Sequence, residues 1–265
     1  ETIPFPEGKK SREYTVMADE FVKETNYNID GVYYVVASTP MVYDIAAIQY
    51  LYGANMTHNS GDTTYSFDPD TPFIEAIWDA GGNDTLDFSN FSESNTISLV
   101  DGEHSTIGFD AKTNEDVDWS MTDNLGIAFN AIIENAIGGS GADTITGNSS
   151  DNNIQGGAGN DIIDGGSGID TAIFKDSSTS YTITTNTNGS ISVVHSPASD
   201  SVTNEGTDSL VNVEYMQFTD KTVASTSLKY SLSASVNSSV NILEAHSESA
   251  ISGTLNFNSG NNIII

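Results

Sequence analysis

A repeat of nine residues is the feature that most constrains how this chain can fold. Residues 138–173 divide into GGSGADTIT, GNSSDNNIQ, GGAGNDIID and GGSGIDTAI, and each unit begins with glycine. The sixth position holds an acid or its amide, and the eighth holds an apolar residue. This is the calcium-binding pattern G-G-x-G-x-D-x-U-x, in which U is a large apolar residue. Three units follow the pattern well, and the second is degenerate.

The spacing of the repeat predicts a specific local geometry. The first six residues form a turn, in which glycine permits positive φ and a close approach of backbone carbonyls to an ion. The last three form a short strand whose middle side chain points inward. Two units complete one coil of a right-handed roll, so alternate turns stack about 4.8 Å apart. A cation between two stacked turns can collect carbonyl oxygens and one carboxylate from each turn, which suits calcium.

Each unit contributes only one inward apolar residue, so apolar burial does not offset the entropy of ordering nine residues. We therefore expect the roll to require calcium in order to fold. The alternative is a flexible Gly/Asn linker. A linker, however, needs neither a nine-residue phase nor a column of inward isoleucines.

The composition also points to bound cations. Acidic residues outnumber basic ones 37 to 8, which gives a formal charge of -29. Such a charge opposes compaction, and it argues against nucleic acid or anionic membranes as partners. The 11 Phe, 11 Tyr and 2 Trp are more than a disordered tail needs. The chain has no cysteine, so disulfides and thiolate metal sites are excluded. No apolar run is long enough to predict a membrane span.

Four segments outside or overlapping the repeat carry a family resemblance. They are TPMVYDIAAIQYLYGANM (residues 39–56), GDTTYSF (61–67), WDAGGNDTLDFS (78–89) and IENAIGGSGADTITGN (133–148). In this order they resemble the C-terminal region of serralysin-type zinc metalloproteases, which carries repeats-in-toxin units. The resemblance covers residues 39–175. It implies an all-β fold, a calcium-bound parallel β-roll, preceded by a short helical remnant of the protease domain.

The segment at residues 39–53 reads as a helix on its own evidence. Thr39 suits the N-cap, Pro40 the first helical position, and Gly53 the C-terminus. We expect its mostly apolar face to pack on a core; that face carries Ile45, Ile48, Gln49 and Tyr52.

The zinc site of the protease family is missing from the sequence. Two His at i and i+4 of a helix must reach one zinc ion in H-E-x-x-H-x-x-G-x-x-H, whereas the four His here are far apart, at His58, His104, His195 and His246. We therefore expect no catalytic residues and no activity from the chain alone, with zinc only in a parent endopeptidase. Met17 in YTVMADEF resembles the family's Met-turn, but Ala18 and Asp19 replace its usual Ser-Tyr. Residues 1–53 thus resemble the end of a protease domain that is cut away upstream or decayed.

The resemblance also implies a set of calcium ligands. A first loop would donate carbonyls from Asn59, Gly61 and Thr63. The loop DAGGND would supply Asp79, Gly81, Gly82 and Asp84. A carbonyl and a carboxylate would come from Ile132 and Glu134. Within the repeat, one edge would pair Gly139, Gly141 and Asp143 with Gly156, Ala158 and Asp161. The other edge would pair Asn148, Ser150 and Asn152 with Gly165, Ser167 and Asp170, where the neutral Asn152 predicts a weaker site.

Downstream, residues 181–196 alternate apolar and polar side chains around Asn188-Gly189. This pattern predicts a β-hairpin with a type I′ turn. His195 is expected to be an ordinary strand residue there and not a ligand. GTDSLVNVEYMQFTD (residues 206–220) repeats the G-x-D-x-U shape once and continues with a strand pattern.

Taken in order, we expect a protease-domain remnant at residues 1–53 and a calcium-binding roll at 54–223. Residues 224–265 would be a β tail or the start of a truncated further domain. The function expected is that of a calcium-dependent, monomeric module of a secreted extracellular protease, with the type I secretion machinery and the protease domain as partners. The alternatives are a surface adhesin module, or a targeting module of a lipase or polysaccharide epimerase. The helix at 39–56 favours the protease.

Overall fold

The fold is known from a computed structural model, which describes Tyr14, residues 37–109, 121–196 and 204–225, and two short strands nearer the C-terminus. Within these residues the chain is mostly strands with one α-helix, α1 (Val42–Tyr52). The predicted all-β class is therefore confirmed. Met17 and His246 lie outside the described residues.

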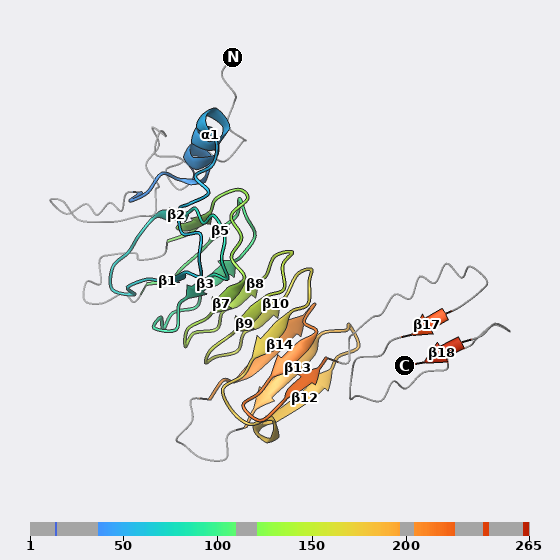
Figure 1. Cartoon of the computed structure of the whole chain (residues 1–265). Helices are drawn as coiled ribbons and strands as arrows, with labels where there is room; N and C mark the ends of the chain where they lie inside the picture. Colours follow the sequence, from blue (N-terminus) through green and yellow to red (C-terminus); the bar gives the residue numbers. More distant parts are fainter. Residues whose placement is uncertain are drawn as a thin grey trace.

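Two sheets run along the molecule as the two walls of a stack of short strands (Figure 1). The first sheet has seven strands, in the spatial order β1 (Thr64–Ser66), β3 (Thr85–Asp87), β7 (Asn135–Ile137), β9 (Asn153–Gln155), β11 (Thr171–Ile173), β15 (Tyr215–Gln217) and β16 (Thr222–Ala224). The second has six, in the order β12 (Tyr181–Thr185), β13 (Ile191–His195), β14 (Thr207–Val211), β10 (Ile162–Asp164), β8 (Thr144–Thr146) and β4 (Thr96–Ser98).

A smaller sheet of three strands lies beneath the helix, in the order β2 (Glu75–Ile77), β6 (Leu125–Ile127) and β5 (His104–Ser105). One 3-10 helix, η1 (Ser178–Ser180), precedes β12. Near the C-terminus, β17 (Asn241–Leu243) and β18 (Asn262–Ile264) pair in parallel.

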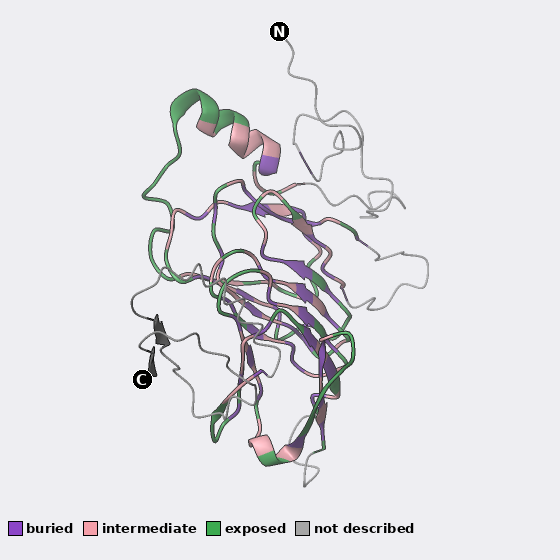
Figure 2. Ribbon diagram, turned by 90° about the vertical axis from the view of Figure 1, so that its right-hand side faces the viewer, coloured by how far each residue is buried: buried purple, intermediate pink, exposed green. Residues whose placement is uncertain are grey.

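The nine-residue repeat places its strands alternately in the two sheets. Ile145 of β8 pairs with Ile163 of β10 in the second sheet, and Ile154 of β9 pairs with Ala172 of β11 in the first. All four side chains are almost completely buried, and Figure 2 shows the buried residues along the strands of the two walls. The predicted inward column at the eighth position of each unit is therefore present. It arises because the middle residue of a three-residue strand must point to one face.

The sheets are mixed and not purely parallel. Within the two long sheets, the pairs in the repeat and upstream of it are parallel, but β12 pairs with β13, and β13 with β14, in antiparallel fashion. In the three-stranded sheet, β5 is antiparallel to β6. In the first sheet, β16 is antiparallel to β15. Short loops join these downstream strands directly, which only antiparallel neighbours allow. The local repeat thus specifies parallel neighbours, while the downstream segment ends each of the two sheets with antiparallel pairs.

The helix differs from its prediction at both its start and its exposed face. It begins at Val42 and not at Pro40, because the Thr39 hydroxyl accepts a hydrogen bond from the Ala76 N–H (2.8 Å) instead of capping the helix. Asp44 accepts from the Met41 N–H (2.9 Å) at the actual N-terminus. Gly53 closes the helix as predicted, with φ 83 and its N–H bonded to the Gln49 carbonyl.

The predicted packing of the apolar helix face is wrong for most of the helix. Val42 is buried against Gly126, where a Cβ would lie only 2.5 Å from Val42 Cγ2. Ile45 is partly buried, whereas Ile48 and Tyr52 are 51% and 83% exposed. Only the first turn of the helix rests on the strand stack, because the helix axis leads away from it (Figures 1 and 2).

The predicted hairpin is confirmed, but its turn is not of type I′. The pairing of Thr185 with Ile191 leaves a five-residue loop, and Gly189 alone in it has positive φ (89). A type I′ turn needs positive φ at both central residues, and Asn188 does not have it. The Gly189 N–H instead bonds the Asn186 carbonyl (3.0 Å), and glycine then turns the chain into β13.

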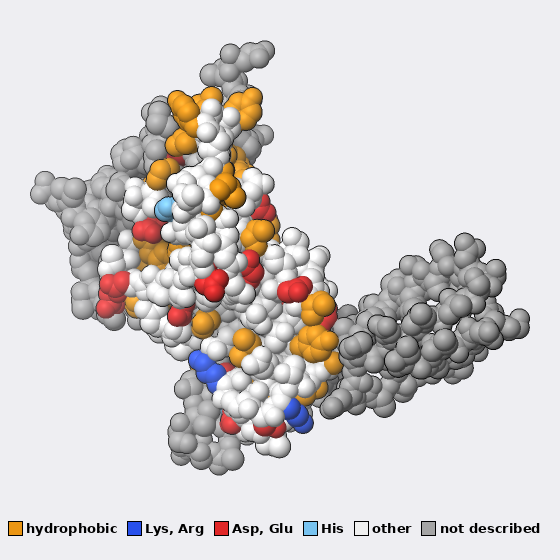
Figure 3. All heavy atoms as spheres, viewed as in Figure 1, with side chains coloured by type: hydrophobic (Ala, Val, Ile, Leu, Met, Phe, Trp, Pro, Cys, Tyr) orange, Lys and Arg blue, Asp and Glu red, His pale blue; other side chains and the backbone are white. Residues whose placement is uncertain are grey.

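Acidic side chains are spread over the face shown in Figure 3, with few Lys or Arg among them. No helix among the described residues is long and apolar enough to cross a membrane.

Candidate metal centre

One position recurs in every coil of the stack: the residue two places before the inward-facing residue of its strand, which we call the turn-end residue. In the repeat it is the sixth position. Parallel pairing sets these residues one above another in two columns. The first stack follows the seven-stranded sheet and holds Thr63, Asp84, Glu134, Asn152, Asp170 and Glu214. The second stack follows the six-stranded sheet and holds Asn95, Asp143, Asp161 and Asp208.

Hydrogen bonds join successive members of the second stack. The backbone N–H of Asn95 donates to Asp143 Oδ1 (2.7 Å), that of Asp143 to Asp161 Oδ1 (2.8 Å), and that of Asp161 to Asp208 Oδ1 (2.9 Å). Each carboxylate therefore uses one oxygen to hold the neighbouring turn. Its other oxygen is left to face its own turn.

The first stack repeats the same bonds with one exception. Thr63 N–H donates to Asp84 Oδ1 (2.8 Å), Asp84 N–H to Glu134 Oε2 (2.8 Å), and Asp170 N–H to Glu214 Oε2 (2.8 Å). The exception is at Asn152, where Oδ1 accepts from the Asn148 N–H of its own turn (2.9 Å) and Nδ2 donates to the Glu134 carbonyl of the neighbouring turn (3.0 Å). The amide nitrogen thus occupies the place of the oxygen that would accept the neighbouring turn's N–H, and the neutral Oδ1 occupies the place of the second carboxylate oxygen.

Among the described residues, three buried carboxylate oxygens have no hydrogen-bond partner: Oδ2 of Asp84, Asp161 and Asp170. All three residues are at most 1% exposed. Burial raises the pKa of Asp161 to about 7, and it raises the pKa of Asp84 and Asp170 to about 6, against nearby hydrogen bonds that lower it. Burial also raises the pKa of Asp143. A buried anion with a free oxygen is costly unless a cation or proton accompanies it.

Glycines in the turns make room for these oxygens. A Cβ at Gly156 would overlap Asp161 Oδ2, and one at Gly165 would lie 2.6 Å from Asp170 Oδ2. Similarly, a Cβ at Gly138 would lie 2.6 Å from Asp143 Oδ2. The first glycine of each unit is therefore required by the side-chain oxygen of the sixth residue of the same unit, which is a carboxylate in three units and the Asn152 amide in the second.

The residues predicted as ligands in the repeat are brought together as pairs of turns. The N–H of Ala158 donates to the Gly139 carbonyl (2.9 Å), and the N–H of Ser167 donates to the Asn148 carbonyl (3.0 Å). Gly159 lies directly against the Gly141 carbonyl. A carbonyl oxygen has two lone pairs, so such a bond leaves one for an ion. The same turns contain the other predicted ligands Asp143, Ser150, Gly156, Gly165 and Asp170. That any of these residues binds calcium stays a prediction.

The loop with Asn59, Gly61 and Thr63 lies on the DAGGND loop. The Ala80 N–H donates to the His58 carbonyl (3.1 Å), and a Cβ at Gly82 would lie 2.8 Å from the Gly61 carbonyl oxygen. Asn59 itself has positive φ (49).

In that loop pair, the oxygens of Asp79 are both in use: Oδ1 accepts from the Gly81 N–H (2.8 Å), and Oδ2 accepts from the Tyr65 hydroxyl (2.6 Å). Glu134 contacts this pair of loops because its carboxylate accepts a hydrogen bond from the Asp84 N–H. The side chain of Ile132 is 49% exposed. Only a backbone role is open to Ile132.

No group of three or more His, Cys, Asp or Glu that could hold a metal ion is found within the described ranges. Any ion between these turns would rely on backbone carbonyls for most of its ligands. Oxygen-only coordination of this kind is the preference of calcium, whereas zinc prefers nitrogen and sulfur.

His195 ends β13 as predicted, but it is buried and specifically bonded. Its Nδ1 accepts from the Glu205 N–H (2.9 Å), and its Nε2 lies 3.4 Å from Asp176 Oδ2. Tyr181 stacks on its ring and donates to the Glu205 carboxylate. The cluster ties the hairpin to the turn that follows it and is structural in character.

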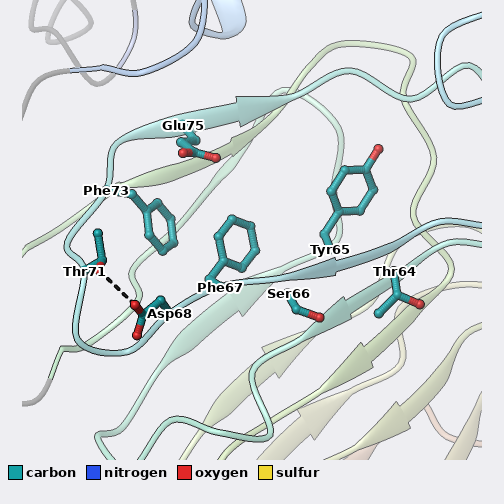
Figure 4. A pocket seen from close by; sticks show the side chains of 8 residues that line it. All are labelled: Thr64, Tyr65, Ser66, Phe67, Asp68, Thr71, Phe73 and Glu75. Atoms are coloured by element: carbon teal, nitrogen blue, oxygen red, sulfur yellow. Dashed lines mark hydrogen bonds between the residues drawn. The ribbon is translucent and has the colours of Figure 1, made fainter.

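A pocket of about 400 Å³ opens beside β1, between Tyr65, Phe67 and Phe73 (Figure 4). Thr71 donates to Asp68 (2.9 Å) at its edge, and Ser38 donates to Glu75 (2.8 Å). Asp68, Thr71 and Glu75 of the pocket lining thus form hydrogen bonds within the chain.

Three turn-end residues escaped the sequence analysis: Asn95, Asp208 and Glu214. Asp208 had a visible signal, since Gly206-Thr207-Asp208 has the G-x-D shape of the repeat. Asn95 and Glu214 had none, because their turns lack the glycines and the nine-residue phase.

Comparison with known proteins agrees with this geometry. The sequence profile of the family described as peptidase M10 serralysin C terminal matches residues 43–252. Serralysin of Proteus mirabilis is 41% identical over 155 residues, which is 53% of this chain and 28% of that protein. Serralysin G of Dickeya chrysanthemi is 49% identical over 121 residues, 41% of this chain and 23% of that protein. Metallopeptidase AprA of Pseudomonas marginalis is 40% identical over 156 residues, 54% of this chain and 30% of that protein.

The chain thus spans less than a third of the length of each of these relatives. The profile match, in contrast, covers most of the chain, including every strand from β1 to β16. This chain therefore belongs to the serralysin C-terminal family of peptidase M10.

Proposed function

We propose that the chain is the calcium-binding β-roll module of a secreted serralysin-like metalloendopeptidase. The observation that supports this most is the set of open, buried carboxylate oxygens on Asp84, Asp161 and Asp170. In a protein of formal charge -29, burying further anions without a cation opposes folding. Bound calcium would remove that penalty at each coil.

Calcium fits the donors better than other common metals do. The turns present carboxylate and carbonyl oxygens, which are hard ligands in a flexible loop. Magnesium holds its waters and needs a small octahedron, so it gains less from carbonyl-lined turns. Zinc belongs to the catalytic part of the parent protease, whose histidine motif does not occur in this chain.

The proposed roll comprises residues 54–223, in which β8 pairs with β10 and β9 with β11 at an offset of two repeat units. Residues 1–53, with α1, would be the end of the protease domain, and residues 224–265 a β tail or the start of another domain. The exposed apolar side chains of Ile48 and Tyr52 on α1 suit a segment that belongs to a neighbouring domain.

Folding would then depend on the calcium concentration on each side of the membrane that the chain crosses during secretion. Calcium sites of the extracellular type have dissociation constants on the order of 10⁻⁴–10⁻³ M. At ten times that concentration each site adds about 1.4 kcal/mol to stability. The chain would stay unfolded in low cytosolic calcium, pass the type I exporter and fold outside the cell. Relatives named serralysin favour this over an adhesin or a lipase or epimerase module.

The test is circular dichroism of the purified chain during calcium titration. Chelator should give mostly coil, and millimolar calcium should give β-structure, whereas the same concentration of magnesium should not. An unchanged spectrum from chelator to millimolar calcium would refute the proposed function.

A further inference from the structure

The loop of the β12–β13 hairpin contains the one Asn-Gly sequence of the chain, at residues 188–189. Asn188 is exposed, and its Oδ1 accepts hydrogen bonds from the Ser190 N–H (3.1 Å) and from the Ser190 hydroxyl (2.8 Å). The side-chain amide of Asn186 donates to Ser190 Oγ (3.0 Å) and so directs the hydroxyl hydrogen toward Asn188. Two donors therefore converge on one side-chain carbonyl oxygen.

This pair of donors has the form of an oxyanion hole. Donors fixed on a carbonyl oxygen stabilise the negative charge that develops there when a nucleophile attacks the carbonyl carbon. Ser190 is 7% exposed and directly precedes β13, and its carbonyl accepts the Asn186 N–H (2.8 Å). Both donors are thus held in place by the folded hairpin, and the Asn188 side-chain carbonyl is polarised for attack at its carbon, Cγ.

The nucleophile that can reach Cγ is the backbone nitrogen of Gly189. The two atoms belong to neighbouring residues, and a bond between them closes a succinimide ring within the chain. Gly189 has no side chain to crowd that ring, and a Cβ there would meet no atom within 4 Å. Its N–H donates to the Asn186 carbonyl (3.0 Å), a bond that must open first. Because Asn186 is exposed, water can replace this bond at small cost.

We propose that Asn188 is a self-modification site, at which the folded hairpin promotes conversion of the asparagine to aspartate or isoaspartate. Hydroxide removes the Gly189 N–H proton, and the nitrogen bonds to Asn188 Cγ while the carbonyl electron pair moves to Oδ1, where Ser190 stabilises it. The Cγ–Nδ2 bond then breaks, and the amide nitrogen takes a proton from water and leaves as ammonia. Water opens the succinimide at either carbonyl. The net reaction consumes water, releases ammonia and involves no change of oxidation state.

The modification has local consequences that do not depend on whether the chain binds calcium. It adds a negative charge to a chain whose formal charge is already -29. In isoaspartate the main chain also runs through the former side chain and gains a methylene, which disturbs the bond between Asn186 and Ser190 at the base of the loop. β12 is an edge strand with β13 as its sole neighbour among the described strands. We therefore expect the hairpin to loosen at its tip while the strands of the repeat keep their pairing.

The experiment incubates the full 265-residue chain between pH 6 and 9, under conditions in which circular dichroism shows β-structure. Peptide mass spectrometry follows each asparagine, and enzymatic methylation detects isoaspartate. Asn186, which is followed by Thr187 in the same exposed loop, is the internal control for Asn188. The same chain unfolded in urea gives the rate that the local sequence alone supports. Ser190→Ala removes one donor, and Ser192→Ala is the matched control at a half-buried position of β13.

We expect modification at Asn188 and not at Asn186, at a rate that rises with pH because the nucleophile is the deprotonated nitrogen. Ser190→Ala should slow the reaction several-fold in the folded chain and leave the rate in urea unchanged. Ser192→Ala should change neither rate. Ser190→Thr, which keeps the hydroxyl, should retain most of the wild-type rate.

An Asn188 that stays intact in the folded chain, whether or not it reacts in urea, would overturn the inference. Equal rates in folded wild type and folded Ser190→Ala would also overturn it, because the hairpin would then contribute nothing beyond its sequence. If Ser190→Ala does not fold, Asn186→Ala takes its place, since it releases the Ser190 hydroxyl by a change at an exposed residue. A slower reaction in that variant supports the inference, and an unchanged rate contradicts it.

Discussion

Asp161→Asn should raise the stability of the fold without calcium and lower it with calcium. The buried Asp161 carboxylate destabilises the fold when it is unpaired and stabilises it when it contacts a bound ion. Burial raises its pKa to about 7 from 3.8. Each pKa unit corresponds to about 1.4 kcal/mol, so the ionised group opposes calcium-free folding at pH 8 by roughly 4 kcal/mol at most. Water reaching the turn and local relaxation reduce this value. We expect the neutral amide to stabilise the calcium-free fold by about 2 kcal/mol.

An asparagine already occupies the position equivalent to Asp161 in the first stack. This residue is Asn152, and its Nδ2 donates to the Glu134 carbonyl (3.0 Å). An amide at position 161 can bond the facing turn in the same way. In calcium, however, the variant loses a charged ligand shared by the turns of Asp143 and Asp208, so its calcium midpoint should rise clearly.

The assay folds the calcium-free chain at pH 8 with trimethylamine N-oxide, which is excluded from protein surfaces and favours burial. Without calcium, Asp161→Asn should fold at a lower concentration of this osmolyte than wild type. Without the osmolyte, it should need more calcium than wild type to fold. The reverse variant, Asn152→Asp, should need more osmolyte, since it adds a buried charge. If Asp161→Asn lowers stability in both conditions, the buried carboxylate is not there for a cation and the reasoning fails.

Two further predictions concern the same turns, and a third concerns the missing zinc motif. Gly156→Ala should cost at least about 2 kcal/mol in calcium, because its Cβ would overlap Asp161 Oδ2, whereas Gly61→Ala, with open space around it, should cost under about 1 kcal/mol; equal urea midpoints would contradict this. The calcium-free chain should gain β-structure in circular dichroism as the pH falls from 8 to 5. The pKa values of Asp84 and Asp161 are raised to about 6 and 7, so the folded state binds more protons than the unfolded state, and its stability is lost as the pH rises through those values; a spectrum that does not change with pH would count against it. Finally, the pure chain should not hydrolyse casein with or without added zinc, because the zinc motif is missing; chelator-sensitive cleavage would show that reading to be wrong.

The sequence alone was sufficient wherever the structure is set by a local period. The nine-residue phase predicted that Ile145, Ile154 and Ile163 point inward and that the sixth position lies at the end of a turn. These features depend only on a strand of three residues following a glycine-rich turn. The all-β class and the hairpin at residues 181–196 follow from equally local patterns.

The tertiary structure alone decided what depends on partners far away in the sequence. The helix starts at Val42 because the Thr39 hydroxyl is engaged by Ala76, and no helix signal encodes that bond. Ile48 is exposed because the helix meets the stack only through its first turn, although its spacing is that of a buried face.

The same holds for the ends of the two acid stacks. Asp208 and Glu214 join Asp161 and Asp170 across 47 and 44 residues, with a hairpin between them. Their spacing carries no period, and Glu214 sits in a turn without glycine. A repeat pattern records which residues follow one another along the chain, whereas an ion site depends on which turns are brought face to face, and strand pairing in the folded sheets decides that.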